Sequence, residues 1–186
     1  TPSNGSMSAT MPNEFLPHAA GSHTIRVTHA ITGGSFVDVG VTVLTGTPDY
    51  FELTGCSGTV PAGEWCDITT KLFDQFGNEL NLSEAGNLTW TTTNGNYSEI
   101  NQQYFPDHVG QWWLNLTSVY GVSSELLITV GHGEMAMLEL NVSSTEITAD
   151  ERVYVNTTRV DVRGNRIAVV LPAENWTKIA DGQLTP

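Results

Sequence analysis

The sequence predicts an all-β chain built from antiparallel β-sandwiches, and three observations carry that prediction. Hydrophobic and polar residues alternate with a period of two along much of the 186-residue chain, turn dipeptides separate the alternating segments, and the pattern repeats after about 87 residues. Alternation is typical of strands that bury one face, and turns about every 8–12 residues are typical of a sandwich. No window of the sequence has a convincing helical stripe.

The alternating segments follow one another along the whole chain. They are centred on Ile25 and Val27, on 37–43, on 66–72, on Leu114 and Leu116, on Ile128 and Val130, and on 153–157. The turn dipeptides are Asn4-Gly5, Gly33-Gly34, Gly77-Asn78, Asn94-Gly95, Gly164-Asn165 and Asp181-Gly182. Glycine and asparagine favour such turns because they reach left-handed backbone angles at low cost.

Short motifs recur in the same order along the chain. At an offset of 87, Phe51-Glu52-Leu53 recurs as Leu138-Glu139-Leu140, 74–78 recurs as 161–165, and 41–43 recurs as 128–130. Further matches have offsets of 88 to 90, such as 24–28 with 113–117 at 89, which small loop insertions would produce. A period near 87 fits one immunoglobulin-like sandwich per repeat.

The two cysteines predict a disulfide. Cys56 and Cys66 are ten residues apart and flank a turn-rich segment. If the flanking residues pair as a hairpin, the two thiols lie opposite each other at bonding distance. Two cysteines with no nearby histidine make a poor zinc site, and a free buried pair is the other alternative. A disulfide implies an oxidising compartment.

Two longer stretches resemble a known family. Segment 46–54 (Gly-Thr-Pro-Asp-Tyr-Phe-Glu-Leu-Thr), with Pro-Ala-Gly at 61–63 and Ile-Thr-Thr-Lys-Leu-Phe-Asp-Gln-Phe-Gly-Asn-Glu-Leu at 68–80, is similar to bacterial and archaeal immunoglobulin-like repeats of the invasin and intimin kind. Segment 109–131 is similar to the later strands of such a repeat. The resemblance implies immunoglobulin-like sandwiches over nearly the whole chain and a role in surface stalks and adhesive arrays. Cys56 and Cys66 are additions to the family's usual pattern.

The phase of the repeat divides the chain into half, whole and half. Residues 1–46 match the C-terminal half of a repeat, 47–132 form a complete repeat, and 133–186 match the N-terminal half. Half a sandwich exposes apolar faces and unpaired strand edges. Each half could be completed in one of three ways: by a neighbouring repeat in a longer array, by strand exchange between copies, or by closure within one chain.

Geometry disfavours closure within one chain, because the poles of a sandwich lie roughly 25–30 Å apart. The two remaining arrangements are head to tail and produce a linear fibre.

Composition argues against several classes of function. The chain has 20 acidic and 7 basic side chains and a formal net charge of −13. That balance argues against binding nucleic acid or an anionic membrane surface, since both require clustered lysine and arginine. The apolar stretches are too short to span a bilayer, and without a leader the sequence is expected to be a mature or excised segment.

Asparagine and threonine usage points to N-glycosylation. Eight of the 13 asparagines begin Asn-x-Ser/Thr, where chance predicts roughly 2.6. These acceptors are Asn4, Asn81, Asn87, Asn96, Asn115, Asn141, Asn156 and Asn175. The alternative is that asparagine and threonine both favour turns and strand ends. With only two lysines, the composition suits an extracellular protein and hints at an archaeal source.

No motif indicates catalysis. The sequence has no Gly-x-Ser-x-Gly, no His-Glu-x-x-His and no phosphate-binding glycine loop. The histidines are scattered, and His18 and His108 occupy corresponding repeat positions, which suggests a structural loop role. The sequence therefore predicts no catalytic residue, no metal site and no cofactor.

Asp74 and Asp161 each begin an Asp-x-x-Gly-Asn motif. We expect each carboxylate to accept backbone hydrogen bonds within a turn. The alternative is a calcium ligand at a joint between repeats, and the acidic residues near the joints are Asp49, Glu52, Glu134 and Glu139.

Adjacent tryptophans on a strand point to opposite faces, so one of Trp112 and Trp113 is expected in the core. The other is then exposed or buried against a neighbouring subunit. An aromatic platform for carbohydrate is an alternative that no repeat-wide aromatic cluster supports.

These patterns predict a non-enzymatic extracellular structural protein. Its immunoglobulin-like repeats would join head to tail, covalently or by strand exchange, into a surface fibre, filament or layer. The expected partners are adjacent repeats or copies of itself, together with N-linked glycans. The alternatives are an adhesin that binds a glycan or receptor, and an accessory domain of a secreted hydrolase.

Overall fold

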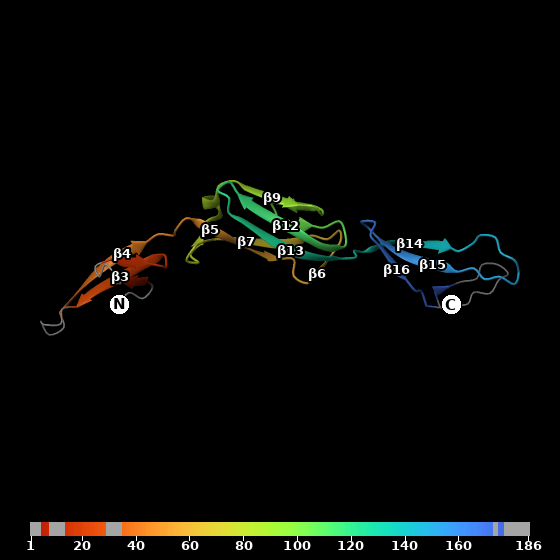
Figure 1. The fold of residues 1–186 in the computed structure, drawn as a ribbon, viewed down its shortest axis with the longest axis horizontal. Coiled ribbons are helices and arrows are strands. Elements are labelled where there is room, and N and C mark those ends of the chain that lie inside the picture. Colours follow the sequence, from red (N-terminus) through yellow and green to blue (C-terminus); the bar gives the residue numbers. More distant parts are fainter. Residues whose placement is uncertain (1–4, 8–13, 29–34, 173–174, 177–186) are drawn as a thin grey trace. The chain divides into compact units, whose positions relative to one another are not determined.

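A computed structural model describes residues 5–7, 14–28, 35–172 and 175–176 (Figure 1). These residues form β-strands and a short 3₁₀ helix, with no α-helix among them. Most strand pairs are antiparallel, as the alternation predicted. In the part of the chain just defined, no helix is long and apolar enough to cross a membrane.

The chain divides into two compact units, which are described separately. Unit 1 contains the described residues of 1–54, 69–91 and 115–126, and unit 2 contains those of 55–68, 92–114 and 127–186. The repeat boundaries predicted after residues 46 and 132 remain predictions.

The N-terminal part of unit 1 contains two strand pairs. Strand β1 (Gly5–Met7) pairs antiparallel with β2 (Phe15–Pro17), and β3 (Gly21–Thr28) pairs antiparallel with β4 (Phe36–Val43). The β3–β4 ladder is continuous from Gly21 opposite Val43 to Thr28 opposite Phe36. Figure 1 draws β3 and β4 side by side in the orange part of the chain.

The central strands form two sheets. The elements in chain order are β5 (Pro48–Gly55), β6 (Thr59–Pro61), β7 (Cys66–Asp74), β8 (Glu79–Leu80), the 3₁₀ helix η2 (Leu82–Ala85), β9 (Leu88–Thr92), β10 (Asn96–Ser98), β11 (Gln103–Phe105), β12 (Gly110–Ser118) and β13 (Ser123–Gly131). One sheet has the order β10-β11-β7-β5 with β8 on β7, and the other has the order β6-β13-β12-β9.

Strand β6 departs from the antiparallel prediction. It pairs in parallel with β13, with Val60 opposite Val130. Alternation within a segment does not encode the direction of its partner, and β6 has only three residues.

The C-terminal part of unit 2 is a three-stranded antiparallel sheet. Its strands are β14 (Met135–Val142), β15 (Val155–Asp161) and β16 (Arg166–Val169), with β15 in the middle. The ladder between β14 and β15 has an irregularity between Met135 and Met137.

Each unit has its own buried hydrophobic residues. In unit 1 one core cluster contains Phe51, Leu53, Leu72, Leu80, Ala85 and Leu116, against which Leu82, Leu88, Trp90, Val122 and Leu126 pack. In unit 2 the buried hydrophobic residues are Val60, Ala62, Ile68, Tyr104, Leu114, Ile128, Val130 and Val160. The unit 1 cluster joins β5, β7 and β8 of one sheet to β12 of the other, which is sandwich-like packing.

Candidate functional site

The turn after β7 is built around the carboxylate of Asp74. Its Oδ1 accepts hydrogen bonds from the backbone N–H groups of Phe76 and Asn78, both at 2.9 Å. Gly77 has a φ of 80°, the left-handed conformation that glycine adopts without strain. The turn predicted from the Asp-x-x-Gly-Asn motif is therefore present in unit 1.

The same side chains reach beyond the turn. Asp74 Oδ2 accepts from the N–H of Gly46 (2.8 Å), which lies between β4 and β5, and from Asn78 Nδ2 (2.8 Å). Asn78 Nδ2 also donates to the carbonyl of His18 (3.0 Å), and Asn78 Oδ1 accepts from the N–H of Ala20 (2.8 Å). We call these five residues the first clasp. It ties one turn to the β4–β5 link and to the loop before β3.

An equivalent arrangement exists within unit 2. Asp161 Oδ1 accepts from two backbone N–H groups of its own turn, and Asp161 Oδ2 accepts from Gly133 N (2.9 Å) and Asn165 Nδ2 (3.0 Å). Asn165 Nδ2 donates to the carbonyl of Asp107 (2.9 Å), and Asn165 Oδ1 accepts from Val109 N (3.2 Å). We call these five residues the second clasp.

The two clasps use equivalent positions of the sequence repeat. The aspartate, the asparagine and the link glycine of the first clasp recur 87 residues later in the second. The two loop positions, His18 and Ala20, recur 89 residues later as Asp107 and Val109. By their hydrogen bonds the counterpart of His18 is therefore Asp107, and not His108 as the sequence predicted. The same five kinds of hydrogen bond are thus made twice, once within each unit.

Both clasp carboxylates are buried yet ionised. Asp74 and Asp161 are only 1% and 2% exposed. Burial opposes ionisation, but the hydrogen bonds from the asparagine side chain and the backbone N–H groups outweigh it and lower the pKa of Asp74 to about 2. The pKa of Asp161 is lowered from its usual value for the same reasons. Each clasp therefore holds a negative charge that hydrogen bonds from N–H donors stabilise.

The side chains beside the two clasps differ. Beside the first, His18 stacks on Phe76 with ring centroids 5.0 Å apart. Beside the second, the equivalent positions hold an ion pair between Asp107 and Arg163, and the guanidinium of Arg163 lies 5.3 Å from the centre of the Phe105 ring. The hydrogen-bonded centre recurs, whereas the contact next to it changes from aromatic to ionic.

The link in the second clasp also packs tightly on a loop of unit 2. A Cβ on Gly133 would lie 2.0 Å from the carbonyl oxygen of Ala62, so only glycine fits there. The backbone of the same loop is hydrogen-bonded from Ala62 N to Gly131 O (2.9 Å) and from Gly63 N to Pro106 O (2.8 Å). The link is therefore fixed from two sides.

Cys56 and Cys66 are disulfide-bonded, with Cα atoms 5.2 Å apart. They lie at the end of β5 and the start of β7, two strands of the same sheet. The pairing agrees with the prediction from spacing.

The predicted glycosylation acceptors lie in different surroundings. Asn4 lies outside the described residues, and six acceptors are exposed: Asn81, Asn87, Asn96, Asn141, Asn156 and Asn175. Asn115 is half-buried in β12, and its Oδ1 is buried without a hydrogen-bond partner. Asn81 caps η2 by accepting from Ser83 N (3.0 Å). Glycosylation of these residues remains a prediction.

The acidic residues near the clasps do not gather. Asp49, Glu52 and Glu134 are exposed, and Glu139 pairs with Arg166 (2.8 Å). Within the described ranges, no three His, Cys, Asp or Glu side chains come close enough to hold a metal ion. The oxygens of Asp74 and Asp161 accept hydrogen bonds from N–H donors, as the turn interpretation expects. Calcium binding stays an untested alternative to the turn interpretation.

The adjacent tryptophans and the loop histidine have structural contacts. Trp113 is about half exposed, while Trp112 is half-buried and its Nε1 donates to the carbonyl of His108 (2.8 Å). The backbone of His108 is also bound at both its N–H and its carbonyl by the side chain of Asn94. Asn94, which is 1% exposed, was predicted only as a turn residue.

Sequence patterns did not indicate that Asn78 and Asn165 reach loops some sixty residues away. The only signal was that both asparagines keep their place in the repeated motif.

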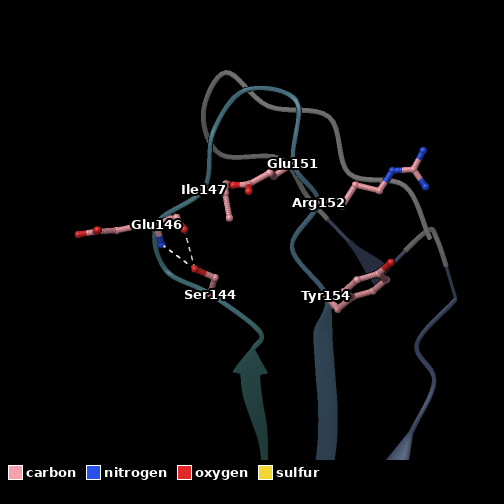
Figure 2. Close-up of a pocket in the computed structure, with 6 residues that line it drawn as sticks. All are labelled: Ser144, Glu146, Ile147, Glu151, Arg152 and Tyr154. Atoms are coloured by element: carbon pink, nitrogen blue, oxygen red, sulfur yellow. Dashed lines mark hydrogen bonds between the residues drawn. The ribbon is translucent and has the colours of Figure 1, made fainter.

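A shallow pocket lies in the loop between β14 and β15 (Figure 2). It is lined by Ser144, Glu146, Ile147, Glu151, Arg152 and Tyr154. Ser144 Oγ donates to the carbonyl of Glu146 (2.6 Å) and accepts from its N–H (3.2 Å), so the hydroxyl is used within the loop. The lining side chains include no nucleophile paired with a general base.

No protein-family model matches this chain, and no curated protein matches it. The resemblance to invasin and intimin repeats therefore remains a prediction.

Proposed function

We propose that the chain is a non-enzymatic extracellular structural protein made of tandem immunoglobulin-like repeats. Residues 47–132 are one complete repeat, and 1–46 and 133–186 are halves of two others. The repeats join head to tail into a surface fibre, filament or layer. The observation that carries the proposal is the clasp, because one hydrogen-bonded arrangement occurs twice at the spacing of the sequence repeat.

The clasp has the chemistry expected of a joint. Each aspartate holds the backbone of a link, Gly46 or Gly133, and each asparagine holds a loop that precedes the link in sequence. Charge-assisted hydrogen bonds in a buried site are stronger than neutral, exposed ones. A joint built from them would resist being pulled or bent, as an array under tension requires.

The remaining features support a location outside the cell. The disulfide is stable in an oxidising compartment, and six exposed asparagines occupy acceptor motifs. A net charge of −13 with few lysines would keep a long fibre solvated and separate from its neighbours.

Electron microscopy of native surface material, labelled with an antibody against this chain, tests the proposal. We expect the label along periodic filaments or a layer. Label confined to discrete soluble particles would contradict the proposal. A glycan array probed with the same protein separates it from the adhesin alternative, since a structural repeat is expected to bind none of the glycans.

A further inference from the structure

One face of the β3–β4 sheet carries apolar side chains that are mostly exposed at the end of the sheet away from the buried His23. The register places Ile25 opposite Val39 and Val27 opposite Val37, so these four side chains share a face. Val27 and Val37 are each 64% exposed. The side chains of the other face pair with one another: Arg26 forms an ion pair with Asp38 at 2.7 Å and stacks over the ring of Phe36.

The β14–β16 sheet of unit 2 has the same character. The register places Leu140 opposite Thr157 and Val142 opposite Val155, on the face that also carries Leu138 and Ile167. Leu140 is 63% exposed, and the three other aliphatic side chains Leu138, Val142 and Ile167 are each above 40%. The opposite face carries the Glu139–Arg166 ion pair. We call these two surfaces the β3–β4 face and the β14–β16 face.

The sequence repeat relates each exposed face to one side of the hydrophobic core of unit 1. Positions on the β14–β16 face correspond, at an offset of 87, to core residues of unit 1: Leu138 to Phe51, Leu140 to Leu53 and Ile167 to Leu80. On the β3–β4 face, Val27 corresponds at an offset of 89 to Leu116 of that core, and Val39 corresponds at an offset of 87 to Leu126, which packs against it. In unit 1 these two sets pack in a single cluster. The two exposed faces are therefore the two halves of one such core.

Arg159 is the exception on the β14–β16 face, because it stands where the core has Leu72. Its Nη2 donates to the carbonyl of Gly133 (3.0 Å). The guanidinium is thus anchored to the link, and its stem can lie along apolar surface.

The parallel pairing of β6 with the edge of β13 has a second counterpart in the repeat, namely segment 146–148 and the edge of β4. In unit 2, β6 pairs in parallel with β13, and Val60 is buried at that contact. The residue equivalent to Val60 is Ile147, which lines the pocket of Figure 2 and is 48% exposed. The residue equivalent to Val130 is Val43 in β4, whose sheet contains only β3 and β4 among the described residues. Segment 146–148 therefore holds the repeat position of β6, with Ile147 in place of Val60, and one edge of β4 is unpaired among the described residues.

We propose that the β3–β4 face of one copy packs on the β14–β16 face of a second copy, and that segment 146–148 of the second copy adds in parallel to β4. The expected register puts Glu146 opposite Thr42 and Ile147 opposite Val43. The contact is heterologous, so repeating it builds an open chain of subunits. The valines of one face would meet the larger side chains of the other; in the core of unit 1 the positions equivalent to Val27 and Val39 are the leucines Leu116 and Leu126. This inference rests on the proposed function, and it identifies a second copy of the chain as the partner of each exposed face.

Cysteine cross-linking of the full-length chain tests the register. Two single variants, Thr42→Cys and Glu146→Cys, are mixed and oxidised, so that a bond between them can form only between molecules. We expect roughly tenfold more mixed dimer than either like-with-like dimer, because bonding needs Cα atoms within about 7 Å. Thr24→Cys, on the polar face of β3, is the matched control and should give no mixed dimer with Glu146→Cys.

Sedimentation at rising concentration gives a second readout. Wild-type protein should associate, Val39→Asp should stay monomeric, and Thr24→Asp should associate like wild type. Circular dichroism checks that each variant is folded. Monomers at every concentration, or equal yields of all three dimers, would overturn the inference. A cross-link that forms only inside the Thr42→Cys/Glu146→Cys double variant would also overturn it, by showing closure within one chain.

Failure here leaves the proposed function separately testable. Filaments in native material combined with no mixed dimer would mean that the halves are completed by covalent neighbours in an array. Discrete particles in native material would remove the structural proposal itself.

Discussion

At the scale of single residues, the buried carboxylates of Asp74 and Asp161 are held by several hydrogen bonds each. Asp74 accepts five hydrogen bonds through its two oxygens, from Gly46, Phe76 and Asn78. A buried charge is tolerated only when such donors replace the water it has lost. The identity of this residue is therefore fixed by charge and by shape together.

Replacing Asp74 by asparagine is expected to lower the free energy of unfolding by about 3 kcal/mol, because the new NH₂ group would face N–H donors in a buried site. Urea denaturation followed by tryptophan fluorescence measures the change. Asp49→Asn is the matched control, since Asp49 is exposed and should change stability by less than about 0.5 kcal/mol. Equal effects of the two substitutions would contradict the assigned role of the clasp.

The depressed pKa also predicts acid sensitivity. The folded pKa of Asp74 is about 2, below its ordinary value of 3.8, so its contribution is complete above pH 4 and is lost as the pH falls towards 2. The loss for this one group is about 2 kcal/mol. The free energy of unfolding, measured from pH 5 to pH 2, should fall less steeply with pH in Asp74→Asn than in wild type. Parallel curves would show that the carboxylate is not stabilised by folding.

The turn formed by Asp74 and Asn78 could be predicted from the sequence, but the hydrogen bonds of Asn78 to a distant loop could not. The Asp-x-x-Gly-Asn motif predicts a turn because its bonds span at most four residues. The bonds from Asn78 to His18 and Ala20 join residues about sixty apart, and no periodicity encodes that distance.

At the scale of elements, the disulfide and the link glycine fix how neighbouring segments are held. The bond between Cys56 and Cys66 closes the loop that carries β6. The backbone of Gly133 passes against Ala62, which follows the same strand.

Removal of the disulfide in a Cys56→Ser/Cys66→Ser variant should cost about 3 kcal/mol, because an open ten-residue loop gains entropy on unfolding. The measurement is the urea midpoint with and without a reductant. Wild type should lose stability on reduction, and the double variant should not respond. A reductant effect of the same size on both proteins would contradict the prediction.

The link glycine should tolerate no side chain. Gly133→Ala is expected to destabilise the protein by more than about 2 kcal/mol, because the new methyl group would overlap the Ala62 carbonyl. Gly40→Ala is the matched control, since a methyl group there would meet no atom within 4 Å and β4 gains a better strand former. Thermal unfolding of both variants measures the difference. A Gly133→Ala protein as stable as Gly40→Ala would contradict the fixed link.

Alternation predicted several of the longer strands but not a short one. It indicated β3, β4, β7, β12 and β13, whereas β5 and β14, eight residues each, were not among the alternating segments. Strand β6 has three residues, too few for a pattern, and its parallel pairing depends on a partner some seventy residues away. The phase of the repeat predicted half-repeats with exposed apolar faces; aliphatic side chains are exposed on β3–β4 and on β14–β16, and the half-repeat boundaries stay predictions.

At the scale of the whole molecule, we interpret the chain as part of a series of sandwiches that carries mechanical tension. Two clasps of one design, a disulfide and a charged exterior would suit that proposed role.

Single-molecule force spectroscopy of the full chain tests this account most directly. We expect a discrete unfolding step of roughly 250 Å for the complete repeat 47–132, because its residues outside the disulfide loop each release about 3.5 Å. Reduction should lengthen the step by about 35 Å as the ten-residue loop is freed. Smooth extension without a step, or a step of the same length with and without the reductant, would contradict a mechanically resistant repeat at 47–132.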